Sequence, residues 1–189
     1  MDRAALIPAL RAWRQSSFHL EALDHYTVEY EERLLGAYLR GEPVRPFDQG
    51  LEEWLERLRE ERAQCKERVR VHAIAGPLTP YLRYEIEWAY TACADAGEDI
   101  RILHRESWDS TPFAKRPPDF YVLDDSTVVL MTYDDAGHWL GGEVMADPAD
   151  VGGYLELRVQ ALAAAVPLHQ YLAAIRHMAC PPPVIPPPR

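Results

Sequence analysis

The segment TPYLRYEIEWAY, residues 79–90, places four aromatic and three charged residues in a predicted helix. Thr79 is a favourable helix N-cap, and Pro80 is tolerated in a first helical turn, where its missing N–H costs nothing. At about 100° per residue, Glu85 falls between the apolar side of this helix and its aromatic side. A carboxylate in that position is at least partly buried, and burial raises its pKa unless a cation or a hydrogen-bond donor pairs with it. Glu85 is therefore the first candidate for acid–base chemistry or for ligand binding.

Three roles for Glu85 are open. In a structural role, its carboxylate would join the helix to the sheet through Arg101, Arg105 or a tyrosine hydroxyl. In a binding protein, the carboxylate would bind a ligand in an aromatic pocket. In an enzyme, Glu85 would be the general acid or base, with Arg83, Arg101 or Tyr81 stabilising an anion.

The motifs of several common enzyme classes are missing from the chain. HLE, residues 19–21, matches the H-x-E of zinc deaminases, but the accompanying P-C-x-x-C is missing. The sequence has no H-E-x-x-H, no G-x-S-x-G and no P-loop. His19, His25 and Glu21 would form only a weak metal site. We therefore expect no metal site and no cofactor.

Size and charge limit the classes of function. The chain of 189 residues has the size of one domain, alone or with a helical extension. Its formal net charge of −10 repels phosphate groups and argues against direct nucleic-acid binding. The basic run at 57–70 also contains three acidic residues, so a solvated helix face is a better interpretation of it than an RNA-binding face. The expected partner is a regulator protein or a small molecule.

Other features concern localisation and origin. The longest apolar runs, such as 161–168, are too short to span a bilayer, and residues 1–15 do not resemble a signal peptide. Cys65, Cys93 and Cys180 are widely spaced, which is typical of reduced thiols. We therefore expect a cytoplasmic protein without a membrane partner. The chain has no asparagine and only two lysines, which indicates a high-GC bacterial genome.

The expected elements begin with helices and continue with strands and helices in alternation. In RVRVHAIA, residues 68–75, valine and alanine alternate with arginine and histidine, as in a strand with one buried face. Helices are expected at 2–15 and 28–41, from an Asp48 N-cap to residue 67, at 79–97, at 147–168 and at 169–179, and further strands at 98–105 and in a three-stranded meander within 119–145.

This order predicts an α/β (α+β) fold, with a small layered sheet and flanking helices, preceded by an N-terminal helical segment. The corresponding domains are the helical segment 1–66, the α/β domain 67–178 and the proline-rich tail 179–189.

Four segments together resemble a family of actinobacterial proteins with a domain of unknown function. They are FHLEALDHY (18–26), PLTPYLRYE (77–85), AGEDIRIL (96–103) and DFYVLDD (119–125). The resemblance covers most of residues 15–172. It implies a small α/β domain, distantly similar in shape to half of a phospholipase D, that is encoded with helix-turn-helix regulators. The H-x-K-x-x-x-x-D motif of phospholipase D is missing, so that chemistry is not expected.

The same resemblance adds candidate site residues by motif. The matching positions are His19, Glu21, Asp24, Tyr81, Arg83, Glu85, Glu98, Arg101 and Asp119. We predict a non-catalytic regulatory or ligand-binding protein that acts through protein contacts, with a DNA-binding protein as one candidate partner. The predicted ligand-binding residues are Tyr84, Trp88, Arg101, Glu21, His19 and Asp24.

Two alternatives to this function remain. The first is a small-molecule enzyme of specialised metabolism, with Glu85, Arg83 and Tyr81 as its catalytic residues. The second is an RNA-facing protein that uses the run at 57–70, and the acidic net charge makes it the less favoured of the two.

Overall fold

A computed structural model describes residues 1–42, 49–108 and 118–179 of the chain. The predicted Asp48 N-cap and all but the first residue of the proline-rich tail lie outside these residues. None of the helices in the described ranges is long and apolar enough to cross a membrane.

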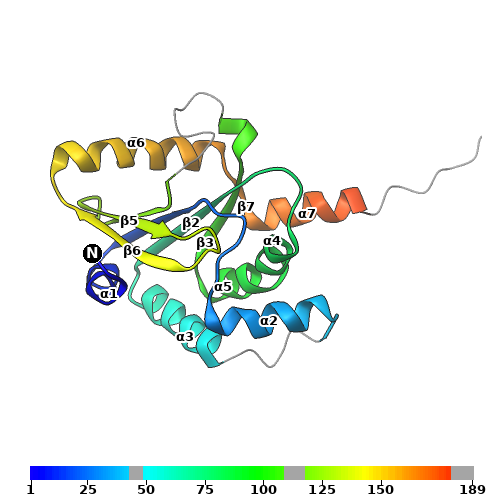
Figure 1. Ribbon diagram of the computed structural model, residues 1–189. Helices are drawn as coiled ribbons and strands as arrows, with labels where there is room; N and C mark the ends of the chain where they lie inside the picture. The colour runs from blue at the N-terminus through cyan, green and yellow to red at the C-terminus, as the bar shows by residue number, and fades with distance from the viewer. Residues whose placement is uncertain (43–48, 109–117, 180–189) are drawn as a thin grey trace, which may run out of the picture.

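A seven-stranded mixed sheet, with strand order β6-β5-β4-β1-β2-β3-β7, forms the centre of the protein (Figure 1). The middle strands β1, β2 and β3 are parallel to one another, whereas the other neighbours pair in antiparallel fashion. The strands are β1 (Ser16–Glu21), β2 (Glu67–Ile74), β3 (Asp99–His104), β4 (Phe120–Leu123), β5 (Thr127–Tyr133), β6 (Trp139–Met145) and β7 (Val166–Pro167).

Helices cover both faces of this sheet. Figure 1 shows α6 (Pro148–Ala164) above the sheet and α1 (Arg3–Arg11), α2 (Glu29–Leu39) and α3 (Gln49–Ala63) below it. The lower layer also contains α4 (Pro80–Tyr84), α5 (Tyr90–Ala96) and α7 (Leu168–Ala179), whose apolar side chains share one core. A short 3₁₀ turn, Arg105–Trp108, follows β3. The predicted α/β architecture, a layered sheet with flanking helices, is confirmed.

The helix predicted from TPYLRYEIEWAY is present but irregular. The Thr79 hydroxyl accepts a hydrogen bond from the Leu82 N–H at 3.1 Å, with Pro80 at the first helical position. The helix ends at Gly97, whose φ of 122° is readily adopted only by glycine. Between α4 and α5, residues Glu85–Ala89 form a π-helical turn rather than the regular helix expected from the sequence.

The first 66 residues contain a strand that the sequence analysis did not identify. Residues Ser16–Glu21, in the segment predicted to be helical, form β1 in the middle of the sheet, between β4 and β2. Its polar and apolar residues alternate over the six positions 17–22, a length typical of a half-buried strand, so a signal for β1 was present in the sequence. The proposed division of the chain at residue 66 stays a prediction.

Strand β2 also differs from the expectation that one of its faces would be exposed. His72 has 0% exposure, and Arg68 is buried as well. Because helices cover both faces of the sheet, the polar side chains of β2 point into the lower layer instead of into solvent. The candidate site is built on this buried polar face.

Candidate functional site

Two neighbouring parallel strands bring four ionisable side chains together. On β1, Phe18 and Leu20 pack in the core beneath α6, so the alternate residues His19 and Glu21 point into the lower helical layer. The register places His19 opposite Arg70 and Glu21 opposite His72. Glu21 and His72 lie near the carboxyl ends of β1 and β2, which is the edge where ligands commonly bind in α/β sheets.

Arg70 is the central cation of this group. Its Nη1 donates to Glu21 Oε1 at 2.6 Å, and its Nε and Nη2 donate to the two carboxylate oxygens of Glu98 at 3.0 and 3.3 Å. Burial alone would raise the pKa of Glu21, but Arg70, the nearby histidines and a hydrogen bond from Tyr90 lower that pKa to about 2. Glu21 is therefore ionised at neutral pH and balances the charge of Arg70.

Tyr90 connects this ion pair to His72. The Tyr90 hydroxyl donates to Glu21 Oε2, and its oxygen also lies 2.6 Å from His72 Nδ1. His72 Nε2 lies 2.7 Å from the Leu23 carbonyl oxygen, which accepts a hydrogen bond from the ring when Nε2 carries the proton. Burial, the largest influence, lowers the pKa of His72.

A second group of buried polar side chains is centred on Asp119, just before β4. Asp119 Oδ1 lies 3.1 Å from His19 Nε2, and Asp119 Oδ2 accepts a hydrogen bond from the Tyr26 hydroxyl. Burial and the Asp119 carboxylate raise the pKa of Tyr26, which keeps this hydroxyl a donor. The His19 ring also stacks on Tyr121, with centroids 3.8 Å apart, and its Nδ1 lies 3.4 Å from Glu21. His19 thus lies between two carboxylates and links the two groups.

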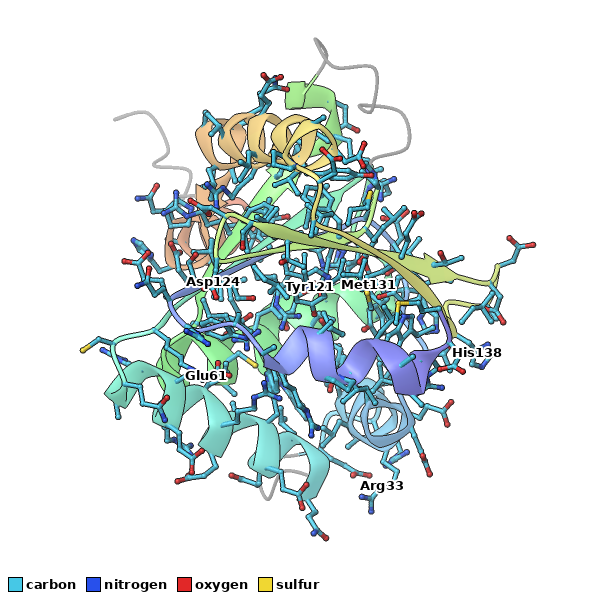
Figure 2. The ribbon with its side chains drawn as sticks, turned by 90° about the vertical axis from the view of Figure 1, so that its left-hand side faces the viewer. Arg33, Glu61, Tyr121, Asp124, Met131 and His138 are labelled. Carbon is cyan, nitrogen blue, oxygen red and sulfur yellow. The ribbon has the colours of Figure 1, made fainter. Side chains whose placement is uncertain are left out.

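A cavity of about 280 Å³ lies between these polar strands and the helices. This volume is near the lower end of the roughly 300–1,000 Å³ that is common for ligand pockets, so it suits a small molecule. Figure 2 shows two of its lining residues, Tyr121 and Met131, beneath the sheet, where both pack near α1. Much of the lining is aromatic, from Tyr26, Trp54, Tyr81, Tyr90, Tyr121, Tyr133 and Trp139.

Glu85 lies on the helical side of the cavity, at the start of the π-helical turn. It is 4% exposed, and its Oε1 has no hydrogen-bond partner among the described residues. Burial, reinforced by the carboxylates of Glu31 and Glu21, raises the Glu85 pKa well above its usual range, although Arg70 and Tyr90 act in the opposite direction. The neutral acid is therefore favoured. Single π-helical turns are rare and frequently occur at functional sites.

Four of the predicted site residues line this one cavity. They are His19, Glu21, Tyr81 and Glu85. Tyr81 is held in place by a hydrogen bond from its hydroxyl to Glu31 Oε2 at 3.0 Å. The predicted burial of Glu85 is therefore present, and so is a nearby tyrosine hydroxyl, that of Tyr90.

The structure places the other predicted site residues elsewhere. Arg83 is exposed on the helix surface, and Tyr84 and Trp88 pack against Tyr38 instead of lining the cavity. Arg101 forms an ion pair with Asp99 on its own strand, at 2.8 Å.

Neither Asp24 nor the arginines proposed as partners of Glu85 reach the cavity. Arg105 donates to the carbonyl oxygens of Ala73 and Ala22 and lies 3.5 Å from Asp24. Asp24 lines a neighbouring hollow instead.

Sequence reasoning missed several residues of the site, chiefly Arg70, His72, Tyr90, Tyr121 and Tyr133. A signal for two of them was present, because an alternating strand in a sheet with helices on both faces must bury its polar side. The tyrosines carry no comparable signal, since they come from separate elements that meet only in the folded chain.

No group of three or more His, Cys, Asp or Glu side chains with the geometry of a metal site occurs within the described part of the chain. The arrangement can instead hold a small molecule between a polar floor, which is the buried polar side chains of β1 and β2, and an aromatic wall, which is the tyrosines and tryptophans of the lining. It can also exchange a proton through Glu85.

Two comparisons with known proteins bear on the identity of the chain. One family model, with the description "Domain of unknown function (DUF6879)", matches residues 4–173. The search of curated proteins finds no match.

Proposed function

The chain belongs to the DUF6879 family, and we propose from its own site that it is a small-molecule-binding regulatory protein that acts through protein contacts. The binding site is the cavity between the β1–β2 floor and the helices α4 and α5. Binding of the ligand would alter the contacts of the chain with another protein, and the ligand would not be converted into a product.

The observation that carries this proposal is the position of Glu85 Oε1. Glu85 lines the cavity, and its Oε1 is buried and has no hydrogen-bond partner among the described residues. A buried polar atom without a partner costs about 1–3 kcal/mol, which is recovered if a ligand supplies the missing contact. Among the described lining residues, His19 Nδ1 also lacks a hydrogen-bond partner, whereas Glu21 and Tyr81 are already hydrogen-bonded, so Glu85 is the carboxyl group at which a ligand is expected to attach.

Binding is favoured over catalysis by how the other polar groups are used. Glu21 and Glu98 are paired with Arg70, and Asp119 accepts from Tyr26. The alternative, an enzyme of specialised metabolism, is supported by the raised pKa of Glu85, which suits a general acid. It would depend on Glu85 and Tyr81, since Arg83 is exposed.

The test is whether the cavity holds a small molecule. We expect native mass spectrometry of the purified full chain to detect a retained small molecule, or a metabolite library to raise its melting temperature. Ala89→Phe, which fills the cavity from its helical wall, should abolish either signal. Ala163→Phe on the exposed side of α6 is the matched control and should retain it. Equal ligand retention by both variants would contradict the proposed site.

The protein that responds to ligand binding is also part of the proposal. The resemblance to actinobacterial proteins encoded with helix-turn-helix regulators, and distantly phospholipase-D-like in shape, supports a DNA-binding regulator as the protein partner in the cytoplasm of a high-GC bacterium. Calorimetric titration of such a regulator into the chain, with and without the retained ligand, would test whether ligand binding changes the affinity for the regulator. A regulator affinity that does not respond to the ligand would contradict it.

A further inference from the structure

We propose that the ligand of this cavity is a small organic cation, an amine whose ammonium group binds Glu85 and whose apolar part lies against the aromatic wall. This inference rests on the proposed small-molecule-binding function and adds the chemical class of the ligand.

The first argument is the charge balance of the lining. Arg70 is the one arginine or lysine side chain among the described lining residues, and its charge is already offset by Glu21 and Glu98. No arginine or lysine of the described lining is therefore left to bind an anionic ligand, whereas a cationic ligand would pair with Glu85 once that carboxyl group ionises.

The second argument is the free oxygen of Glu85. An ammonium group donates hydrogen bonds and accepts none, so it matches a buried carboxyl oxygen that lacks a donor. Such a bond is charge-assisted once Glu85 is ionised, and charge-assisted hydrogen bonds are stronger than neutral ones. A neutral hydroxyl could also reach Glu85 Oε1 but would gain less from the surrounding carboxylates.

The surroundings of Glu85 predict that binding releases a proton. The titratable or charged groups that face it are Glu31 on α2, Glu21 on β1, Arg70 on β2, Tyr81 on α4, and Tyr90 and Cys93 on α5. Burial and the two neighbouring carboxylates favour the neutral acid in the empty cavity. An ammonium group beside Glu85 would reverse this preference, and the Glu85 proton would pass to solvent as the ammonium–carboxylate pair forms.

The third argument is the aromatic part of the cavity lining. Tyr81, Tyr121 and Tyr133 line the cavity, and the faces of aromatic rings attract cations through their negative electrostatic potential. The protein already uses this contact with its own cations, since Arg3 lies over Trp139 and Arg68 over Trp54. Apolar residues such as Leu51 and Met131 complete a surface that suits a hydrocarbon or ring substituent.

The experiment compares three probes of one shape on the full chain. They are 2-phenylethylamine, 2-phenylethanol and phenylacetate, which are cationic, neutral and anionic at pH 7. We expect isothermal titration to give an affinity for the amine about tenfold or more above that for the alcohol, with no binding of the acid. Titration of the amine in phosphate and in Tris should show a net release of protons on binding, which can be measured because the buffers differ in ionisation enthalpy.

Two variants assign the effect to Glu85. Glu85→Gln should weaken amine binding about tenfold and abolish proton release, while the affinity for 2-phenylethanol changes by less than about twofold. Glu87→Gln, an exposed change on the same helix, should leave the results unchanged. If Glu85→Gln does not fold, the proton count of the wild-type chain decides, because it needs no variant.

Other outcomes separate this inference from the proposed function. Phenylacetate or 2-phenylethanol binding as tightly as the amine would overturn the cationic class and leave small-molecule binding standing. The absence of binding by both 2-phenylethylamine and hexylamine would also overturn it. In that case the ligand retention of Ala89→Phe and Ala163→Phe would still decide the proposed function independently.

Discussion

At the scale of single residues, two buried carboxyl groups that line one cavity have opposite pKa shifts. The pKa of Glu21 is lowered to about 2, because Arg70, the histidines and Tyr90 outweigh its burial. The pKa of Glu85 is raised, because burial and the neighbouring carboxylates outweigh Arg70. Pairs of acids held in different protonation states are typical of working sites. Glu21 fixes the polar floor, and Glu85 remains available to a ligand or a proton.

Glu85→Gln should make the empty protein more stable at neutral pH. The Glu85 pKa is above 4.5 in the folded chain and returns towards 4.5 on unfolding, so wild-type stability falls as the pH rises from 4.5 to the folded pKa. Glutamine removes this loss, and we expect a gain of roughly 1–3 kcal/mol at pH 7 that disappears near pH 4. Urea unfolding at both pH values measures this change in the free energy of unfolding, with Glu87→Gln as control. Destabilisation at pH 7 would instead support a structural role in which Glu85 joins the helix to the sheet.

Arg70→Gln should have the opposite effect. It leaves Glu21 and Glu98 buried without a cation, which typically costs about 3–5 kcal/mol. The loss should be full above pH 4.5 and should shrink as the pH falls towards 2, where wild-type Glu21 takes up a proton. Arg101→Gln removes a half-exposed ion pair on the next strand and should cost less than about 1 kcal/mol in the same urea experiment. Equal losses would show that Arg70 is not the central cation.

At the scale of elements, the stability of the helix that carries Glu85 depends on Gly97, the residue at which it ends. A Cβ atom at Gly97 would lie 2.6 Å from Arg62 Cδ, and the φ of 122° disfavours any side chain. Gly97→Ala should therefore lower the unfolding free energy by about 1–3 kcal/mol.

The matched change Gly153→Ala, in α6 with no atom within 4 Å of the new Cβ, should instead raise the unfolding free energy by about 0.5–1 kcal/mol. Thermal unfolding of both variants measures the difference. Equal effects would contradict the role of Gly97 in ending the helix.

The sequence predicted the elements better than their contacts. The helix at 79–97, the β4–β6 meander and the Asp147 cap of α6 follow from caps, alternation and turns, and they are present. The burial of Glu85 also followed from its angular position. The π-helical turn did not, because one added residue in a hydrogen-bonding pattern leaves no mark on the hydrophobic period. Arg70 was missed because the alternation of β2 was interpreted without the helices that cover both faces of the sheet, and these helices bury its polar side.

At the scale of the whole molecule, β1 joins the two parts of the sheet. It pairs with β2 on the parallel side and with β4 on the antiparallel side, so the meander reaches the parallel strands only through β1. The same strand contributes His19 and Glu21 to the cavity floor. The site and the sheet therefore depend on a segment that lies before the domain boundary predicted at residue 66.

The last prediction tests that boundary. A fragment of residues 67–178 lacks β1, α2 and α3, which leaves β2 and β4 without their shared neighbour and opens the core that Leu51, Leu55 and Leu58 help to fill. Open strand edges and an uncovered apolar face favour aggregation over folding. We expect this fragment to lack a cooperative thermal transition by circular dichroism. The chain shortened to residues 1–179, which keeps every described element, should retain the transition. A fragment that unfolds cooperatively as a monomer would show that the α/β domain is independent of the first 66 residues.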